Sequence, residues 1–345
     1  MKPELKAVAD RQHGLVTRAQ AVAAGYRERQ LRTLTAAHGP WVVVRRGVYA
    51  ERELVDLASE RRDGLACLRD RAAHLVMREP HLMSHDSAAR AWGLPHLTAR
   101  RELVHVTREG VLGTRTEGGV KHHLTRLGLL NRQVLDGMAV TSLARTALDL
   151  GREHGLEAGV VAADAARRRG VSLADLHAEL AVMKHWPHVT VARTAVELCD
   201  PGAETPGESL TRLLVIEGGL GPIQTQVPLP LGGRVAWVDL LVGRHVIEFD
   251  GRVKFRRAID GGVASRAVED VLWDERTRQN DICALGFGMS RVVWDELMGG
   301  RRTETLARLK REYAITEARF GSALPADLRQ FRDRMADERQ RRCRA

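Results

Sequence analysis

Three carboxylates lie in the segment Val235–Asp250, which has the pattern of a half-buried β-hairpin. Two apolar-rich runs flank Gly243-Arg244, and a Gly-X pair is the two-residue loop of a type II′ turn. A turn of this type fixes the register of the two strands, because each step back along one strand pairs with a step forward along the other. We therefore expect Val242 to face His245.

This register predicts that Asp239 lies opposite Glu248, with Asp250 on the same face one diagonal away. Directly opposed carboxylates have Cβ atoms about 5 Å apart, and such pairs destabilise a sheet unless a cation or a shared proton lies between them. Hard divalent cations prefer carboxylate oxygens. The three acids therefore predict a site for Mg²⁺ or Mn²⁺.

The simpler interpretation is that the acids line a solvated face and that Asp250-Gly251 starts a turn. Three apolar residues of the same predicted face, Trp237, Leu241 and Val246, make that face only partly polar. The acids thus converge on its one charged patch, which favours a metal site. A bulge or a longer loop would shift the register and separate them.

The segments around the hairpin follow an order that is known from nucleases. They are G-E-S-L at Gly207–Leu210, T-Q-V-P-L at Thr225–Leu229, V-D-L-L at Val238–Leu241, E-F-D-G at Glu248–Gly251, D-E-R-T-R-Q-N-D at Asp274–Asp281 and S-R-V-V-W at Ser290–Trp294. In this order, residues 205–297 resemble the very-short-patch-repair-like (Vsr-like) endonuclease domains of the PD-(D/E)XK superfamily. The resemblance implies a restriction-endonuclease-like α/β domain that hydrolyses phosphodiester bonds with a metal ion.

The resemblance also implies roles for single residues. Asp239 and Glu248 would hold the metal, Asp250 would help to position it or its water, and Glu208 would complete the acidic cluster from a helix. Lys254 stands where such domains often carry histidine, and it would stabilise the attacking hydroxide or the phosphate. All five are candidate catalytic residues.

Each supporting residue also has a structural interpretation. Lys254 could be an exposed cation at a strand end, and Glu208 could serve the backbone in a capping box with Thr205 as N-cap. Arg278 and Arg291 could bind phosphate oxygens. An ordinary surface pair of Arg278 with Glu275 is slightly favoured over phosphate binding.

The amino terminus predicts a different activity. Leu5–Arg11 is expected to be a helix, a capping box at Thr17–Gln20 opens a second helix that Gly25 ends, and a third helix is expected over Arg27–Ala37. Two short strands then follow over Trp41–Ala50. Three helices and a hairpin predict a winged helix, in which the third helix enters the major groove and the wing contacts phosphates.

Basic residues lie where such a domain contacts DNA. Arg27, Arg29 and Arg32 surround the exposed side of the third helix, and Arg45-Arg46 form the wing tip. The alternative is a small helical domain with a solvated basic face. Because both the helix and the wing are basic, we favour contact with double-stranded DNA.

Residues up to Ala50 resemble the winged-helix domain of AbiEi-like (type IV) antitoxins, through Gln20-Ala21 with Gly25 and through Arg46–Tyr49. The resemblance implies operator binding and repression of the protein's own operon. It continues more weakly through three segments: Ser84–Leu94, Val104–Thr107 and Val140–Leu150. These have structural interpretations, including an i, i+4 pair of Arg145 with Asp149 and a hydrogen-bonded His85 near a helix start, and no chemistry is assigned to them.

Composition fits a nucleic-acid partner. Lys and Arg total 54 against 44 for Asp and Glu, a net charge of +10 that favours polyanions. Aromatic residues are only 4%, which argues against a base-stacking platform for single strands. Four cysteines show neither metal-ligand spacing nor disulfide density, and the chain contains no apolar run of membrane-spanning length. We therefore expect a soluble, cytoplasmic protein.

These observations predict an α+β multidomain protein: a winged helix (residues 1–52), an AbiEi-like α/β middle domain (53–200), a Vsr-like domain (201–300) and a basic helical tail (301–345). The end of the tail, Arg339–Arg344, is expected to be a helical extension that frays into disorder. The favoured function is a metal-dependent DNA endonuclease of defence or repair type. The alternative is a transcriptional repressor or antitoxin whose nuclease-like domain is inactive. A nuclease for RNA or branched DNA is a third, weaker hypothesis. Expected partners are double-stranded DNA and a toxin or repair protein, and the oligomeric state is left open.

Overall fold

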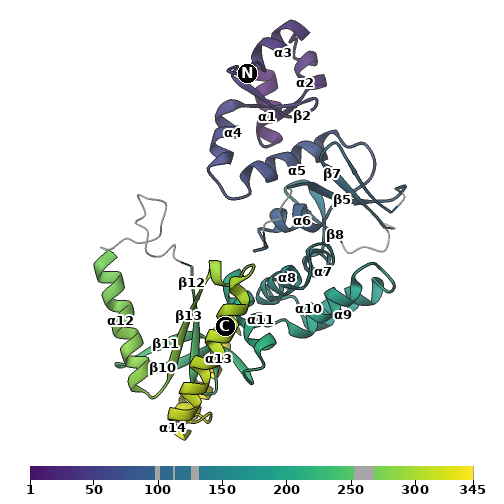
Figure 1. Cartoon of the computed structure of the whole chain (residues 1–345). Coiled ribbons are helices and arrows are strands. Elements are labelled where there is room, and N and C mark those ends of the chain that lie inside the picture. The colour runs from purple at the N-terminus through teal and green to yellow at the C-terminus, as the bar shows by residue number, and fades with distance from the viewer. Residues whose placement is uncertain (98–101, 112, 126–131, 252–267, 345) are drawn as a thin grey trace. The chain divides into compact units, whose positions relative to one another are not determined.

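The computed structural model describes residues 1–97, 102–111, 113–125, 132–251 and 268–344. The chain forms two compact units. Unit 1 contains residues 1–162 and 171–196, and unit 2 contains residues 163–170 and 197–345. Both units contain helices and sheets (Figure 1), which confirms the mixed α/β fold class. Among the described residues, no helix has both the length and the apolar character that a bilayer crossing requires.

The first part of unit 1 has the three helices and the hairpin predicted for residues 1–52, with one further strand, β1, between the first two helices. The elements are α1 (Pro3–Arg11), β1 (Leu15–Thr17), α2 (Arg18–Ala23), α3 (Glu28–Leu34), β2 (Trp41–Arg45) and β3 (Val48–Glu51). The strands form an antiparallel sheet in the order β1-β3-β2. A core of buried side chains, among them Leu5, Leu31 and Trp41, joins the helices to one face of this sheet.

The other face of the small sheet packs on a helix that comes later in the chain. Leu15, Val48 and Ala50 are buried together with Leu68 and Ala72 of α5 (Gly64–Val76). α5 also contacts β5 (Val104–Arg108) of a larger sheet. The small sheet therefore shares its core with the residues that follow it.

The larger sheet of unit 1 has the strand order β6-β7-β5-β4-β9-β8. Its remaining strands are β4 (Leu82–Met83), β6 (Thr114–Glu117), β7 (Val120–Leu124), β8 (Arg132–Leu135) and β9 (Met138–Thr141). The other helices of this region are α4 (Arg52–Ser59), α6 (His85–Trp92), α7 (Leu143–His154), α8 (Leu156–Arg168), α9 (Leu173–Val182) and α10 (Val189–Leu198). The β5–β7 pair is parallel, and α6 and α7 pack against each other beside the sheet.

Unit 2 is built on a sheet in the order β10-β11-β12-β13. Its strands are β10 (Ile223–Leu231), β11 (Arg234–Val242), β12 (His245–Asp250) and β13 (Gly288–Val293). The predicted register is confirmed at the turn end of the hairpin, where Val242 pairs with His245 and Leu240 with Ile247. The pairing predicted for Asp239 with Glu248, one step further from the turn, stays a prediction. Gly243 has a φ of +58°, as the first central position of a type II′ turn requires. β13 then pairs with β12 in parallel.

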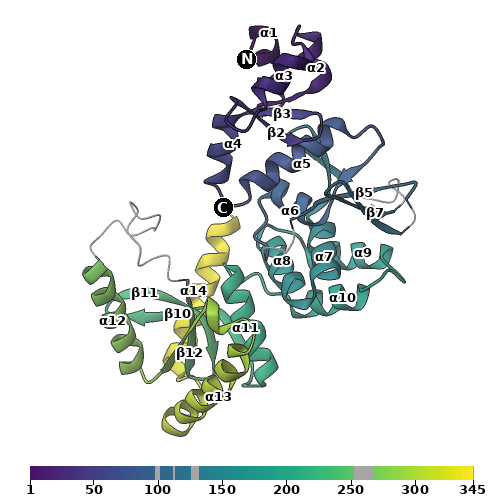
Figure 2. The ribbon, with the colours of Figure 1, turned by 45° about the horizontal axis from the view of Figure 1, so that its top comes forward.

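Helices cover both faces of this sheet (Figure 2). They are α11 (Pro206–Gly218), α12 (Val268–Ala284), α13 (Arg301–Phe320) and α14 (Ala326–Arg344). Ile282 of α12 and Leu328 of α14 share a core with Val246. Phe249, the neighbour of Glu248 along β12, points to the other face, where it lies against Gly207 of α11.

The last 45 residues are mostly helical, as predicted, but they also pack on the sheet. α13 packs on β12 and β13, and α14 packs along β10. α14 continues to Arg344, so the segment Arg339–Arg344, which was expected to fray, is part of a helix. Buried Leu309 and Leu328 explain the difference, because they give these highly charged helices an apolar side to bury. The basic composition of the segment did not reveal this apolar side.

His245 predicts a pH dependence of stability. Its Nδ1 lies 2.7 Å from Thr316 Oγ1 and its Nε2 2.7 Å from Ser290 Oγ, and it is only 1% exposed. Burial lowers the pKa of His245 from 6.5 to about 4, although Glu312 opposes this shift. The unfolded chain therefore binds a proton first as the pH falls, and the stability contributed above pH 6.5 is lost progressively down to about pH 4.

Within that window, we expect protonation of His245 in the unfolded chain to lower the free energy of unfolding by about 1.4 kcal/mol for each unit by which the pH falls. A His245→Gln variant keeps a polar side chain but does not titrate. Urea unfolding of both proteins at the two ends of the window measures the difference. Equal losses in wild type and variant would contradict the assignment.

Candidate nucleic-acid interface and acidic cluster

The predicted recognition helix is short and held firmly at its start. Thr17 and Gln20 form the predicted capping box of α2, and Arg18 of α2 pairs with Glu28 at the start of α3. Leu31 is 3% exposed and anchors α3 in the core. The predicted end at Ala37 is wrong, because α3 ends at Leu34.

The residues that follow α3 do not continue the helix, because the side chain of Arg52 holds them. Arg52 donates hydrogen bonds to the carbonyls of Gly39 (2.7 Å) and Ala37 (2.9 Å). These bonds hold the segment beside the end of β3 and satisfy carbonyls that a longer helix would have used. The arginine responsible lies 15 residues from Ala37, outside the local pattern that predicted the helix.

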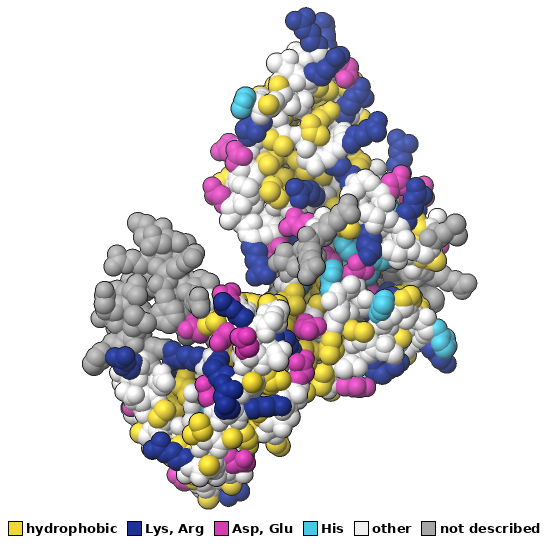
Figure 3. All heavy atoms as spheres, in the orientation of Figure 1, with side chains coloured by type: hydrophobic (Ala, Val, Ile, Leu, Met, Phe, Trp, Pro, Cys, Tyr) yellow, Lys and Arg dark blue, Asp and Glu magenta, His cyan; other side chains and the backbone are white. Residues whose placement is uncertain are grey.

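Three of the five predicted DNA-contacting arginines of this region lie on or next to α3. Arg29 and Arg32 are exposed on the helix, and Arg27 is exposed at its N-cap instead of within it. Lys and Arg side chains are prominent over α2 and α3 in the surface view (Figure 3). The exposed side of α3 therefore combines positive charge with a rigid backbone, as a major-groove reader requires.

The wing tip differs from the prediction. Gly47 turns the chain between β2 and β3 with a φ of +79°, and Arg46 is exposed beside it. Arg45 is half-buried, and its guanidinium donates a 3.0 Å hydrogen bond to the carbonyl of Gly118. Burial also lowers the pKa of Arg45. Arg45 is thus held by unit 1 itself, whereas Arg46 is the predicted wing cation that faces solvent.

The hairpin acids of unit 2 lie as neighbours but make different contacts. Asp239 Oδ2 accepts a 2.9 Å hydrogen bond from the backbone N–H of Phe249, which holds its carboxylate against β12. Glu248 is 5% exposed and forms a two-point ion pair with Arg278 of α12, at 2.7 and 3.0 Å. Arg278 also donates to the carbonyl of Trp237 at 2.9 Å. Arg278 thus binds a buried carboxylate; the side chain of Glu275, its predicted surface partner, lies outside the described residues.

Glu208 has the capping role that was one of its two interpretations. Its carboxylate accepts hydrogen bonds from the backbone N–H of Glu204 (2.8 Å) and from the hydroxyl of Thr205 (2.9 Å), while Thr205 caps α11. Gln226 contacts the same carboxylate at 3.4 Å from a backbone conformation with φ of +49°. Burial raises the pKa of Glu208. Its oxygens therefore serve the start of α11.

Two other predicted site residues, Asp250 and Arg291, lie on the neighbouring strands β12 and β13. Asp250 is half-buried at the end of β12, where it pairs with Val293, and Arg291 of β13 pairs with Glu248 in the parallel register. Lys254 lies outside the described residues. Asp239, Glu248 and Asp250 do not form a group of three potential metal ligands; within the described part of the chain, one such group occurs, and it is made of histidines.

The helices and the hairpin of residues 1–52 lie in a segment that matches a known protein family. Residues 3–52 match the family described as "Transcriptional regulator, AbiEi antitoxin". The match covers the helices and the wing, confirms the predicted resemblance for these residues and supports a DNA-binding role for this AbiEi-like segment. It ends before the hairpin acids, so the nuclease domain stays a prediction. No curated protein matches the chain.

Sequence reasoning missed the histidine group in the middle of unit 1. Its members are His85, His105 and His123, and we had assigned this region no chemistry. His105 and His123 are 18 residues apart in sequence and come from different strands, so no local spacing reveals that they meet. The available signal was the presence of histidines inside strands with buried neighbours.

Proposed function

We propose that this protein is a DNA-binding transcriptional regulator of the antitoxin type. It binds duplex DNA by placing α3 in the major groove, where Arg29 and Arg32 reach base edges or phosphates, while Arg46 on the wing contacts the backbone. The observation that carries the proposal is the exposure of these arginines on a rigid helix within the segment that matches the family. The positive net charge of the whole chain adds long-range attraction to DNA.

The direct test is binding of the purified full-length chain to DNA upstream of its own gene. We expect a retarded complex in gel shifts, stronger than that with an unrelated duplex of equal length, and an affinity that falls steeply with salt. Fluorescence anisotropy across a salt series measures both effects. Equal, weak binding to both duplexes at low salt only would refute sequence-selective regulation.

A partner toxin is part of this proposal. The matched family is described as antitoxins, so the product of a neighbouring gene is the first candidate partner. We expect its expression alone to arrest growth and coexpression of the present chain to restore it. If coexpression of the chain does not relieve the growth arrest, the antitoxin part of the proposal is rejected and the regulator part stands.

A second candidate function is Mg²⁺-dependent hydrolysis of DNA by unit 2. It is supported by the contact of Asp239 with the backbone N–H of Phe249, the residue between Glu248 and Asp250. The strained backbone of Gln226, which contacts Glu208, also supports it, since such strain gathers at functional sites. In this proposal Asp239, Glu248 and Asp250 bind the ion, and Arg278 exchanges Glu248 for a phosphate oxygen. The metal would activate water and neutralise charge on the phosphate.

A cleavage assay separates the two candidates. Wild-type protein, Asp239→Ala and Glu248→Ala are incubated with plasmid and duplex oligonucleotides across Mg²⁺ and Mn²⁺ concentrations. The nuclease proposal expects nicked products from wild type only. Intact DNA under conditions where binding is measurable would reject it and leave the regulator. RNA and branched DNA belong in the same substrate panel.

A further inference from the structure

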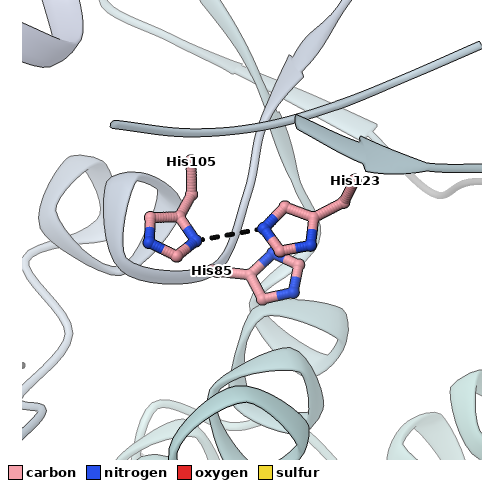
Figure 4. Close-up of side chains that lie close together, drawn as sticks. All are labelled: His85, His105 and His123. Atoms are coloured by element: carbon pink, nitrogen blue, oxygen red, sulfur yellow. Dashed lines mark hydrogen bonds between the residues drawn. The ribbon is translucent and has the colours of Figure 1, made fainter. Parts of the chain in front are cut away.

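Three imidazoles from separate elements meet in the interior of unit 1 (Figure 4). His85 stands at the start of α6, His105 on β5 and His123 on β7. One ring nitrogen of each lies within 4.8 Å of those of the other two. His105 Nδ1 is 3.1 Å from His123 Nε2, and the rings of His85 and His123 stack at a centroid distance of 3.7 Å.

Carboxylates lie behind two of these rings. His105 Nε2 is 3.5 Å from Asp86 Oδ2, and His85 Nε2 is 3.9 Å from Asp149 Oδ1. A carboxylate on the far nitrogen of an imidazole orients the ring and raises its basicity, which is the usual outer shell of a metal-bound histidine. His154 adds to this shell through a 2.7 Å contact with Asp86.

We propose that His85, His105 and His123 form a binding site for a borderline divalent transition metal, with Zn²⁺ as the best fit. Imidazole nitrogens suit Zn²⁺, whereas Mg²⁺ prefers oxygen ligands and retains water. Three histidines leave a fourth coordination position open, the pattern of zinc sites that bind a water or substrate. The site is separate in ligands and in metal preference from the carboxylates of unit 2.

The imidazoles are in the state that a metal needs. Burial lowers the pKa of His105 to about 4 and that of His123 to about 3, and it lowers the pKa of His85 well below 6.5. At neutral pH the rings are therefore uncharged and carry a lone pair each.

A cavity of about 240 Å³ opens beside the cluster. His85 and His123 line it together with Arg145, Arg152 and Thr107. Arg145 is 1% exposed and its Nη1 has no hydrogen-bond partner in the structure, and the same holds for the Oγ1 of Thr107, also 1% exposed. Buried polar atoms without partners are costly and need an explanation.

An oxyanion in the cavity supplies that explanation. One of its oxygens would occupy the open metal position, and the others would accept hydrogen bonds from Arg145 and Thr107. Arg145 and Arg152 flank the ring of Trp186 at 4.5 and 5.0 Å, which holds both guanidinium groups at the cavity. The ligand class expected at this metal is therefore phosphate or a phosphate ester.

The test uses the full-length protein, stripped of metal with a chelator. Calorimetry with Zn²⁺ is expected to give one equivalent bound per chain, and Co²⁺ is expected to give the intense visible bands of a four-coordinate nitrogen site. Inorganic phosphate should shift those bands. Failure to bind either ion, or a weak six-coordinate Co²⁺ spectrum, would overturn the metal site.

Variants place the ion on the histidines. His105→Ala and His123→Ala should each weaken Zn²⁺ binding on the order of 100-fold or more, and Asp86→Asn by about 10- to 100-fold. His177→Ala removes an exposed histidine of α9 and should leave binding unchanged. Circular dichroism checks folding, and His105→Gln serves if the alanine variants unfold. Equal binding in His105→Gln, His123→Ala and wild type would refute the assignment.

A further variant tests the anion. Arg152→Leu should keep Zn²⁺ binding while reducing the phosphate-induced shift of the Co²⁺ bands. If phosphate shifts the bands of this variant and of wild type equally, the metal site stands and the oxyanion part is wrong.

Discussion

Replacing Arg29 and Arg32 together with glutamate is expected to weaken binding to the preferred duplex on the order of 100-fold or more. Both side chains are exposed on α3, whose orientation is set by buried Leu31 and by the Arg18–Glu28 pair. Loss of one base or phosphate contact costs about 1–3 kcal/mol, and the new carboxylates repel the DNA backbone. Anisotropy titrations of wild type and variant measure the loss.

The salt dependence distinguishes phosphate contacts from base contacts. Each phosphate contact contributes about 0.9 to the slope of log affinity against log salt, so loss of two such contacts flattens the slope by about 1.8. The control replaces two exposed arginines of other helices, Arg193 of α10 and Arg311 of α13, with glutamate, which makes the same charge change outside α3. If this control weakens binding as much as the α3 variant, general charge and not the helix would be the cause.

The second large effect concerns the core of unit 2. Arg212 of α11 donates to both carboxylate oxygens of Asp164, at 3.1 and 3.0 Å, and the two side chains are 5% and 1% exposed. The backbone N–H of Asp200 also donates to Asp164, at 2.6 Å. Burial raises the pKa of Asp164 even with Arg212 in place. An Arg212→Leu change leaves this carboxylate buried without its counter-charge.

We expect Arg212→Leu to lower the free energy of unfolding by about 3–5 kcal/mol. The double variant Arg212→Leu with Asp164→Asn should recover much of the loss, because the amide keeps an acceptor for Asp200 without a charge. Chemical denaturation measures all three proteins. Arg302→Leu is the matched control: its ion pair with Glu217 is partly exposed, and its loss should cost under about 1 kcal/mol. A similar cost for both arginines would contradict the role of burial.

Local patterns predicted the local geometry well. The Gly243-Arg244 turn fixed the β11–β12 register, and the Thr17–Gln20 capping box started α2, as expected. In each case the residues that decide the geometry are neighbours in sequence. A two-residue turn or a cap needs no information about the rest of the chain.

Contacts between distant segments explain what the sequence did not reveal. Arg45 donates a hydrogen bond to a carbonyl 73 residues later in the chain, and Glu248 pairs with Arg278, 30 residues away. No local pattern pairs Arg278 with the predicted acids. The histidines of unit 1 lie on α6, β5 and β7, and the pairing of β5 with β7 brings two of these elements together.

The sheet β1-β3-β2 limits where the chain can be cut to give a soluble fragment. The family match ends at Arg52, but Leu15, Val48 and Ala50 are covered by Leu68 and Ala72 of α5. A fragment cut at that point would present a bare apolar surface to water and would tend to self-associate. A fragment that keeps this surface covered should therefore run at least through Val76, so the end of the family match is not the end of the unit that folds.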